Sequence, residues 1–208
     1  MVETLGMRDR MTARHSAAVA RFAKAIAAAA GLPSRDQELV HTAGLLHDVG
    51  KFTFPDHTLT GTRLTEEDWE LIRSHPERGA DIVGRVHGYA EVAEIVLCHH
   101  ERIDGRGYPR HLSGDEIPVL ARILAVADCF DVMTARDSYR DPVSSEEALV
   151  ELRRVAGTQL DPVVVEVFVE MIERHGVAFR HADEADFEKE LAFDRRVRDY
   201  ARPKVAAL

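Results

Sequence analysis

Apolar residues recur along most of the chain at the three-to-four-residue spacing of amphipathic helices. Residues 9–30 form an alanine-rich amphipathic segment that ends at Gly31, with Pro33 just beyond it. Ser34 is expected to cap a second helix, which Gly50 closes. This stretch therefore predicts two consecutive helices.

The middle of the chain carries further helix signals. Thr65 followed by Asp68 resembles a capping box, and Pro76 suits the first turn of the next helix. Residues 89–100 make another apolar segment of helical length. Residues 101–117 hold three glycines and a proline, so we expect an irregular, exposed loop there.

Pro118 opens the most apolar segment, VLARILAVADCFDVMTA, which is hydrophobic almost all round and is expected to lie at the centre of the fold. Ser144 or Ser145 caps the following helix. The pair Asp161-Pro162 starts a valine-rich segment that could form a strand. The cap, the proline at the first position and the length favour a helix.

These elements predict an all-α fold with one helical domain over residues 1–176. Residues 177–208 are more charged and are expected to form a helical extension that packs on this domain or on a second subunit. The apolar positions of that extension, at roughly helical spacing, are Phe187, Leu191, Val197 and Tyr200.

Composition narrows the function. The formal net charge of -9 argues against a surface that binds a nucleic acid polymer, but it allows a small anionic ligand in a local cationic site. No apolar run is long enough for a membrane span, and the charged N-terminus does not resemble a signal peptide, so a cytoplasmic protein is expected. Cys98 and Cys129 lie in apolar helical stretches and are interpreted as core residues.

Histidines and aspartates mark candidate chemistry. Seven candidate metal ligands are spread over five predicted helices, and all are nitrogen or oxygen donors: His15, His47, Asp48, His75, His99, His100 and Asp128. Five imidazoles and two carboxylates are enough to hold two divalent ions if one carboxylate bridges them. A helical bundle could bring these residues together.

The adjacent pairs set a condition on the fold. Neighbouring residues differ by about 100 degrees around a helix, so His47-Asp48 and His99-His100 can face one cavity only where a helix ends. Asp128 is the most informative candidate, because a carboxylate within an apolar helix is costly to bury without a cation or a strong partner. The alternatives for Asp128 are a helix cap or a buried pair with an arginine such as Arg122.

Cationic side chains near these ligands could meet an anionic substrate. Lys51 lies one turn from Asp48 and could direct its ammonium at an anion, although a lysine at a helix C-terminus is equally favoured by the helix dipole. Arg102 is a candidate phosphate contact in the glycine-rich loop, whereas solvated loop charge is favoured for Arg106 and Arg110.

Four motifs together resemble the HD-GYP subgroup of the HD phosphohydrolase superfamily. They are HDVGK at 47–51, SHPERGA at 74–80, HHERIDGRGYP at 99–109 and the AVADCFDVMT segment at 125–134. The resemblance implies an all-α fold around a metal cluster, most often iron or manganese, that hydrolyses cyclic di-GMP to pGpG or GMP. Zinc, nickel and magnesium stay open as alternatives.

The resemblance also assigns roles. It implies that the metal ligands are His47, Asp48, His75, His99, His100 and Asp128, with Asp48 bridging and His15 as a further candidate. It implies catalytic roles for Asp48 and Lys51, and a substrate cleft that includes Lys51, Arg102, Gly107, Tyr108 and Pro109. Some members with a third metal carry a glutamate where this chain has Met11, so two ions are expected.

The working hypothesis is metal-assisted phosphodiester hydrolysis by a metal-bridging hydroxide, without a side-chain nucleophile. Two alternatives are the same centre acting on another nucleotide, and a non-catalytic module that docks a cyclase or adaptor protein through the GYP loop. Members usually carry a sensory domain ahead of the catalytic one, for which this chain has no room, so regulation is expected from a partner unless the chain is a fragment. A homodimer through the extension is a further expectation.

Overall fold

The computed structural model describes residues 10–55, 58, 64–135 and 142–175, and the side chain of Met11 and the extension at 177–208 lie outside the part that it describes. The elements follow in the order α2 (Arg10–Ala29), α3 (Ser34–Leu46), the 3-10 helix η1 (Val49–Thr53), α5 (Glu66–Arg73), α6 (His75–Gly84), α7 (Ala90–Cys98), the 3-10 helix η2 (Gly114–Glu116), α8 (Val119–Thr134), α9 (Ser145–Val155) and α10 (Pro162–His175). Across the described residues, helices and an isolated bridge between Ala156 and Leu160 are the regular structure, so the all-α prediction is confirmed.

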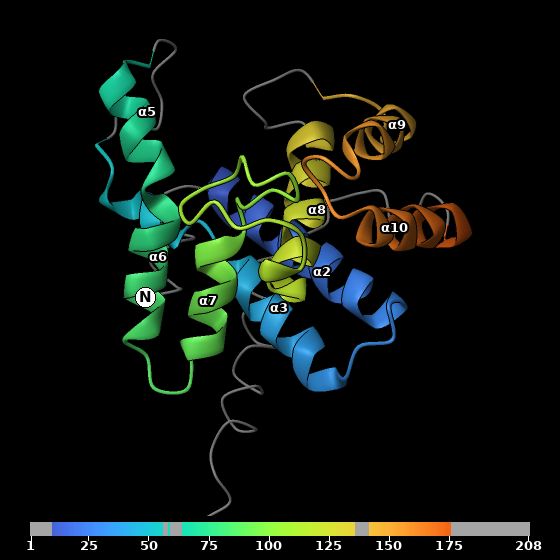
Figure 1. The fold of residues 1–208 in the computed structure, drawn as a ribbon, viewed down its shortest axis with the longest axis horizontal. Helices are drawn as coiled ribbons and strands as arrows, with labels where there is room; N and C mark the ends of the chain where they lie inside the picture. The colour runs from blue at the N-terminus through green and yellow to red at the C-terminus, as the bar shows by residue number, and fades with distance from the viewer. Residues whose placement is uncertain (1–9, 56–57, 59–63, 136–141, 176–208) are drawn as a thin grey trace, which may run out of the picture.

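Helix α8 is the central element of the fold. It contacts α2, α3, α7, α9 and α10, and Figure 1 shows it between α7 and α10. Three buried phenylalanines join α2, α8 and α10: the ring centroids of Phe22 and Phe130 lie 5.3 Å apart, and those of Phe130 and Phe168 lie 4.9 Å apart, both edge to face. The central position predicted for the apolar segment after Pro118 is thus confirmed.

Local hydrogen bonds explain where several helices begin. Thr65 and Asp68 form the predicted capping box at the start of α5. Ser144, rather than Ser145, caps α9 in the same way with Glu147. At α10 the Asp161 carboxylate accepts a hydrogen bond of 2.8 Å from the backbone N–H of Val163, so the valine run is helical, as favoured over a strand.

Two predicted boundaries were wrong. Pro33, not Ser34, occupies the N-cap position of α3, in extended backbone and without a side-chain cap. This helix ends at Leu46 rather than at Gly50, because the chain tightens into η1 directly after the His47-Asp48 pair. The earlier helix end frees both side chains of that pair to face the same region.

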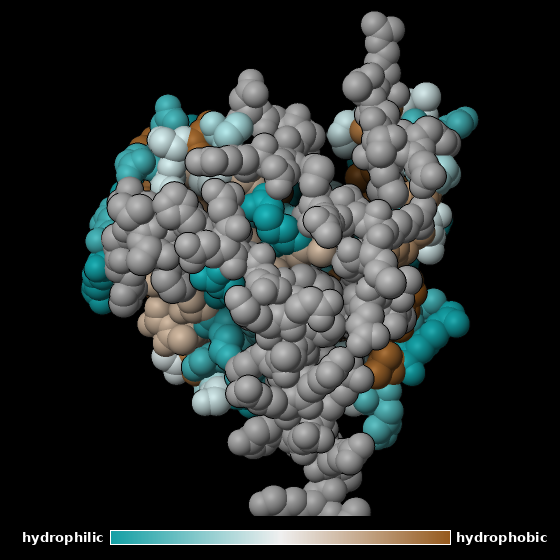
Figure 2. All heavy atoms as spheres, turned by 180° about the vertical axis from the view of Figure 1, so that it is seen from behind, coloured by the Kyte–Doolittle hydropathy of each residue, from teal (hydrophilic) through white to brown (hydrophobic). Residues whose placement is uncertain are grey.

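The described surface is mixed in polarity. Within the described residues, no helix is long and apolar enough to cross a membrane. The large exposed hydrophobic side chains are single residues on separate elements, among them Trp69 on α5, Val150 on α9 and Val163 on α10. Where described residues are visible in Figure 2, hydrophilic side chains alternate with isolated hydrophobic ones. Scattered hydrophobics of this kind are ordinary for a protein surface.

Candidate metal centre

Five helices supply the predicted ligands, and all seven residues come together. The contributions are His15 from α2, His47 at the C-cap of α3 with Asp48 after it, His75 as the first residue of α6, His99 at the C-cap of α7 with His100 after it, and Asp128 from α8. Both adjacent pairs stand at helix ends, as their spacing requires. The spatial prediction is therefore confirmed, while the roles of the residues remain predictions.

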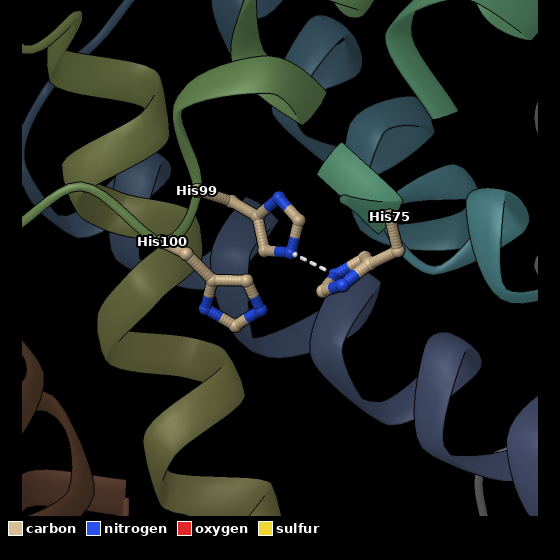
Figure 3. Close-up of side chains that lie close together, drawn as sticks. All are labelled: His75, His99 and His100. Carbon is tan, nitrogen blue, oxygen red and sulfur yellow. Dashed lines mark hydrogen bonds between the residues drawn. The ribbon is translucent and has the colours of Figure 1, made fainter. Parts of the chain in front are cut away.

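The ligand atoms form two groups. In one group, His75, His99 and His100 offer ring nitrogens that all lie within 4.8 Å of one another, and Figure 3 shows these rings turned toward each other. In the other, His15, His47 and Asp48 offer atoms within the same limit. We call these the α6–α7 triad and the α2–α3 triad. Each offers three donors, which suits a first coordination shell that a substrate or water completes.

Asp48 lies between the two triads. Its Oδ1 is 3.4 Å from Nε2 of His75 in the α6–α7 triad, and its Oδ2 is 3.5 Å from Nε2 of His47 in its own triad. One carboxylate thus faces both groups with different oxygens. This is the placement that a bridging ligand needs.

Backbone carbonyls fix three of the imidazoles. Nδ1 of His47 lies 2.8 Å from the carbonyl oxygen of Gly44, and Nδ1 of His75 lies 2.6 Å from that of Ile72. His99 makes the same contact with the carbonyl three residues before it. Because an Nδ1–H donates to each carbonyl, each Nε2 keeps its lone pair and faces the centre, as in known metal sites.

This tautomer has a consequence inside the α6–α7 triad. Nε2 of His75 and Nε2 of His99 face each other at 3.2 Å, as the dashed line in Figure 3 marks. When both Nδ1 atoms carry the proton, two lone pairs point at one another, and this arrangement is unfavourable without a cation nearby. The donor set and its orientation therefore fit a divalent metal ion.

The pKa values of several candidate ligands are shifted toward the protonation states that bind a metal ion. Burial lowers the pKa of His75 to about 4 and that of His100 to about 3, so both imidazoles are neutral at pH 7. Burial would raise the pKa of Asp48, but the nearby ammonium of Lys51 holds it well below its usual value. The neutral imidazoles of His75 and His100, beside the ionised carboxylate of Asp48, are in the protonation states that a divalent cation requires.

His15 differs from the other imidazoles. Its Nε2 is 3.3 Å from Oδ1 of Asp128, and its Nδ1 is 2.7 Å from Oδ2 of Asp131. Burial would lower the pKa of His15, but the hydrogen bonds to these two carboxylates raise it to about 10. The alternative in which Asp128 pairs with Arg122 was wrong, because Arg122 pairs with Asp115 and Asp161 instead.

Lys51 reaches into the centre from η1. Its Nζ is 2.7 Å from Oδ1 of Asp48 and 2.8 Å from Oδ2. The ammonium therefore lies beside the carboxylate that joins the two triads, rather than only at a solvated helix end.

The glycine-rich loop folds back onto the His99-His100 pair. The backbone N–H of Tyr108 donates a hydrogen bond of 3.2 Å to the carbonyl of His100, and the two rings lie 4.9 Å apart. A Cβ on Gly107 would lie 2.6 Å from the same carbonyl oxygen, so only glycine allows this approach. Gly107 and Tyr108 thus lie against His100, one of the candidate metal ligands, and Pro109 follows them in the chain.

The prediction that residues 101–117 are exposed was wrong in part. Glu101, Gly107 and Ile117 are buried, because the loop is held against the body of the domain. Both carboxylate oxygens of Glu101 accept backbone hydrogen bonds, from Arg110 at 2.6 Å and from Leu112 at 3.1 Å. Glu101 therefore ties the far end of the loop to the helix end that carries the histidine pair.

Replacing Glu101 by glutamine should loosen this loop. An amide has one oxygen and one N–H₂ group, so one of the two backbone N–H donors loses its acceptor, at a cost of about 1–3 kcal/mol. The free energy of unfolding should fall by this amount, and the amides of Arg110 and Leu112 should exchange hydrogen faster. The control is Glu94→Gln, since Glu94 makes a surface ion pair with the Arg110 side chain, which is worth about 0–1 kcal/mol. Equal stability of the two variants would contradict the role given to Glu101.

The loop arginines have partners within the domain. Arg102 is held by Asp104 at 2.6 Å and by Gln159 at 3.2 Å, so its predicted contact with phosphate stays a prediction. Arg110 pairs with Glu94 at the surface, and the Arg106 side chain is exposed, in agreement with the structural interpretation favoured for both.

Sequence reasoning missed two buried acids, Asp131 and Glu101. Asp131 is fully buried and lies three residues after Asp128, so a second carboxylate on one face of an apolar helix was the available signal. Glu101 had no comparable signal, because its partners are backbone groups of a loop whose path the sequence does not reveal.

Gly50 makes a second close approach at the centre. A Cβ there would lie 2.1 Å from the carbonyl oxygen of His75 and 2.8 Å from the backbone N of Gly79. Gly50→Ala should therefore push η1 away from α6 and lower the free energy of unfolding by about 1–3 kcal/mol or more. The matched control is Gly84→Ala on α6, where the nearest atom would be 3.6 Å away, and helix propensity should raise stability by about 0.5–1 kcal/mol. Denaturant unfolding measures both, and a Gly50→Ala variant as stable as the wild type would refute the close approach.

Comparisons with known proteins show the family of the chain. A family model described as "HD domain" matches residues 2–164. The chain is 38% identical over 166 residues to a Vibrio cholerae protein named "3'3'-cGAMP-specific phosphodiesterase 2", covering 78% of this chain and 32% of the relative. It is 37% identical over 182 residues to a Thermotoga maritima "Cyclic di-GMP phosphodiesterase", covering 86% of this chain and 50% of the relative. The chain thus spans half or less of the length of these relatives.

Solved structures share the fold. A crystal structure of a cyclic GMP-AMP specific phosphodiesterase of V. cholerae superposes with a TM-score of 0.65 at 24% identity, covering 93% of this chain and 50% of that one. The HD domain of the L. monocytogenes phosphodiesterase PgpH, in complex with cyclic-di-AMP, gives a TM-score of 0.63 at 19% identity, covering 84% of this chain and 93% of that one. At these identities the superpositions establish the helical fold.

Proposed function

The chain belongs to the HD domain family, and we propose that it is a metal-dependent phosphodiesterase that hydrolyses cyclic di-GMP. The observation that carries this proposal is the position of Asp48 between two triads of metal-ligand atoms. The name of the T. maritima relative and the HHERIDGRGYP segment support the choice of substrate.

The proposed ligands divide between two divalent ions. His75, His99 and His100 would hold one ion, and His15 with His47 would hold the other, with Asp48 shared and Asp128 facing His15. Iron or manganese is the proposed metal, as the family resemblance implies, and zinc, nickel and magnesium stay open as alternatives for the same nitrogen and oxygen donors. Ions bound there supply Lewis-acid stabilisation of phosphoryl charge and activate water near neutral pH.

The chain's own residues would orient the substrate and balance its charge. The Lys51 ammonium, beside Asp48, is placed to stabilise charge that develops on the phosphoryl oxygens. The Gly107, Tyr108 and Pro109 wall would bound the cleft next to His100, with Arg102 as a further phosphate contact. Addition of water across one phosphodiester bond gives pGpG, with the proton going to the departing 3'-oxygen, and a second hydrolysis gives GMP.

A second candidate substrate is 3'3'-cGAMP. The V. cholerae relative that carries this name is as similar to this chain as the cyclic di-GMP relatives are. Both cyclic dinucleotides contain the same 3',5' linkages, so the bases alone distinguish them. A non-catalytic module that docks a cyclase or adaptor through the GYP loop remains the alternative outside the enzymes, and a dimer through residues 177–208 is part of the proposal.

One experiment tests these candidates together. Protein purified without oxygen is divided for elemental analysis and for cleavage assays with cyclic di-GMP, 3'3'-cGAMP and cyclic di-AMP. We expect about two ions per chain and the fastest turnover with cyclic di-GMP. An ion-containing protein that cleaves none of the three would refute the phosphodiesterase proposal, and an ion-free protein without activity would favour the docking module.

A further inference from the structure

Asp131 is a buried carboxylate that the proposed ligand set leaves out. It lies on the central helix α8 with no exposed surface. Its Oδ2 is 2.7 Å from Nδ1 of His15, whereas its Oδ1 is buried and has no hydrogen-bond partner in the described part of the chain. Burying a carboxylate with one unpaired oxygen is costly, so its one contact must matter.

The contact places His15 between two acids of one helix. Asp128 and Asp131 are three residues apart and share a face of α8. The Nδ1 side of the His15 ring meets Asp131, while Nε2 faces Asp128 at 3.3 Å and Asp48 at 4.0 Å. With Nδ1 held in this way, Nε2 is the ring nitrogen that points into the α2–α3 triad.

This support differs in kind from that of the other imidazoles. His47, His75 and His99 each rest their Nδ1 on a backbone carbonyl within their own helix. His15 instead rests on a charged side chain 116 positions away in sequence. A carboxylate is a stronger acceptor than a carbonyl, and it raises the basicity of the imidazole that it holds.

We propose that Asp131 is a positioning residue for His15, which selects the tautomer with Nε2 facing the α2–α3 triad and thereby sets the affinity of that triad for a divalent ion. The inference rests on the proposed metal role of the triads and not on the identity of the substrate. Asp131 itself does not touch the ion.

The test measures Mn²⁺ binding to metal-depleted protein by calorimetric titration, without any assay of turnover. Asp131→Asn keeps the shape of the side chain and removes its charge. We expect the affinity for one of the two ions to fall about 10–100-fold, the usual effect of losing an outer-shell partner of a ligating histidine, and the affinity for the other ion to stay unchanged. The control is Asp161→Asn, because Asp161 is also a buried acid but caps α10 and pairs with Arg122.

A double-mutant cycle separates positioning from general damage to the core. His15→Gln should weaken the same ion site, and adding Asp131→Asn to it should cause little further loss, since the two residues act as one unit. Wild-type affinities in Asp131→Asn would overturn the proposal, as would independent, additive losses in the double variant. Loss of Mn²⁺ sites in Asp161→Asn as well would also overturn it, because the effect would then follow from destabilisation alone. Wild-type protein that binds Mn²⁺ but cleaves no cyclic dinucleotide would refute the proposed activity and leave this comparison intact.

Discussion

Replacing Asp48 with alanine is expected to abolish both divalent-ion binding and phosphodiester hydrolysis. Asp48 is the residue whose two oxygens face His47 and His75, so its loss removes a donor from both triads at once. It also leaves the Lys51 ammonium among the imidazoles without its counter-charge. We expect ion affinity to fall by more than about 100-fold, the upper range for loss of a mere outer-shell partner. Elemental analysis and a cyclic di-GMP cleavage assay on one sample measure both effects.

Two further variants separate the loss of a ligand from a general loss of stability. Asp48→Asn keeps the size of the side chain and should lose the same functions with less effect on folding, which thermal unfolding monitors. Asp81→Ala removes a surface acid that pairs with Arg85 and should behave as the wild type. Turnover retained in Asp48→Ala would end the proposed mechanism.

Lys51→Met is expected to separate catalysis from metal binding. Loss of a group that stabilises transition-state charge lowers kcat by about 10²–10³-fold. Ion affinity should not fall, because Nζ of Lys51 occupies both oxygens of Asp48 and its positive charge opposes a cation there. Steady-state kinetics and metal titration on the same protein measure the two effects.

The control for this prediction is Lys24→Met, which removes a half-buried lysine that pairs with Glu38 between α2 and α3, away from the two triads. Its kcat should equal that of the wild type, and Lys51→Arg should recover part of the lost rate by restoring a cation. A wild-type kcat in Lys51→Met would mean that Lys51 serves only as a favourable charge at the end of a helix.

The sequence was sufficient to predict that the candidate ligands come together, because the residues that end a helix are close to it in sequence. Two adjacent ligands can face one site only at a helix end, and the glycine-rich loop after His100, which includes Gly107, predicts that the helix ends there. Asp128 could be singled out because an acid within an apolar helix needs a compensating partner. These arguments depend only on residues close in sequence, so the structure agrees with them.

What could not be predicted depends on contacts between distant segments. The link from Asp131 to His15 joins two helices whose relative rotation no local pattern fixes. The burial of the loop follows from Glu101 and from the approach of Gly107 to the His100 carbonyl, and the composition of the loop alone indicates exposure. The end of α3 at Leu46 was likewise hidden, because Gly50 stops no helix but fits against the backbone of α6.

The inward-facing lone pairs of His75 and His99 link ion binding at the centre to the stability of the whole chain. A ligand that binds only the native state stabilises it by about 2.7 kcal/mol when its concentration is a hundred times its dissociation constant. An ion at this point would relieve a repulsion and hold the start of α6 against the end of α7. The lifetime of the protein against unfolding and proteolysis would then rise and fall with the supply of the metal.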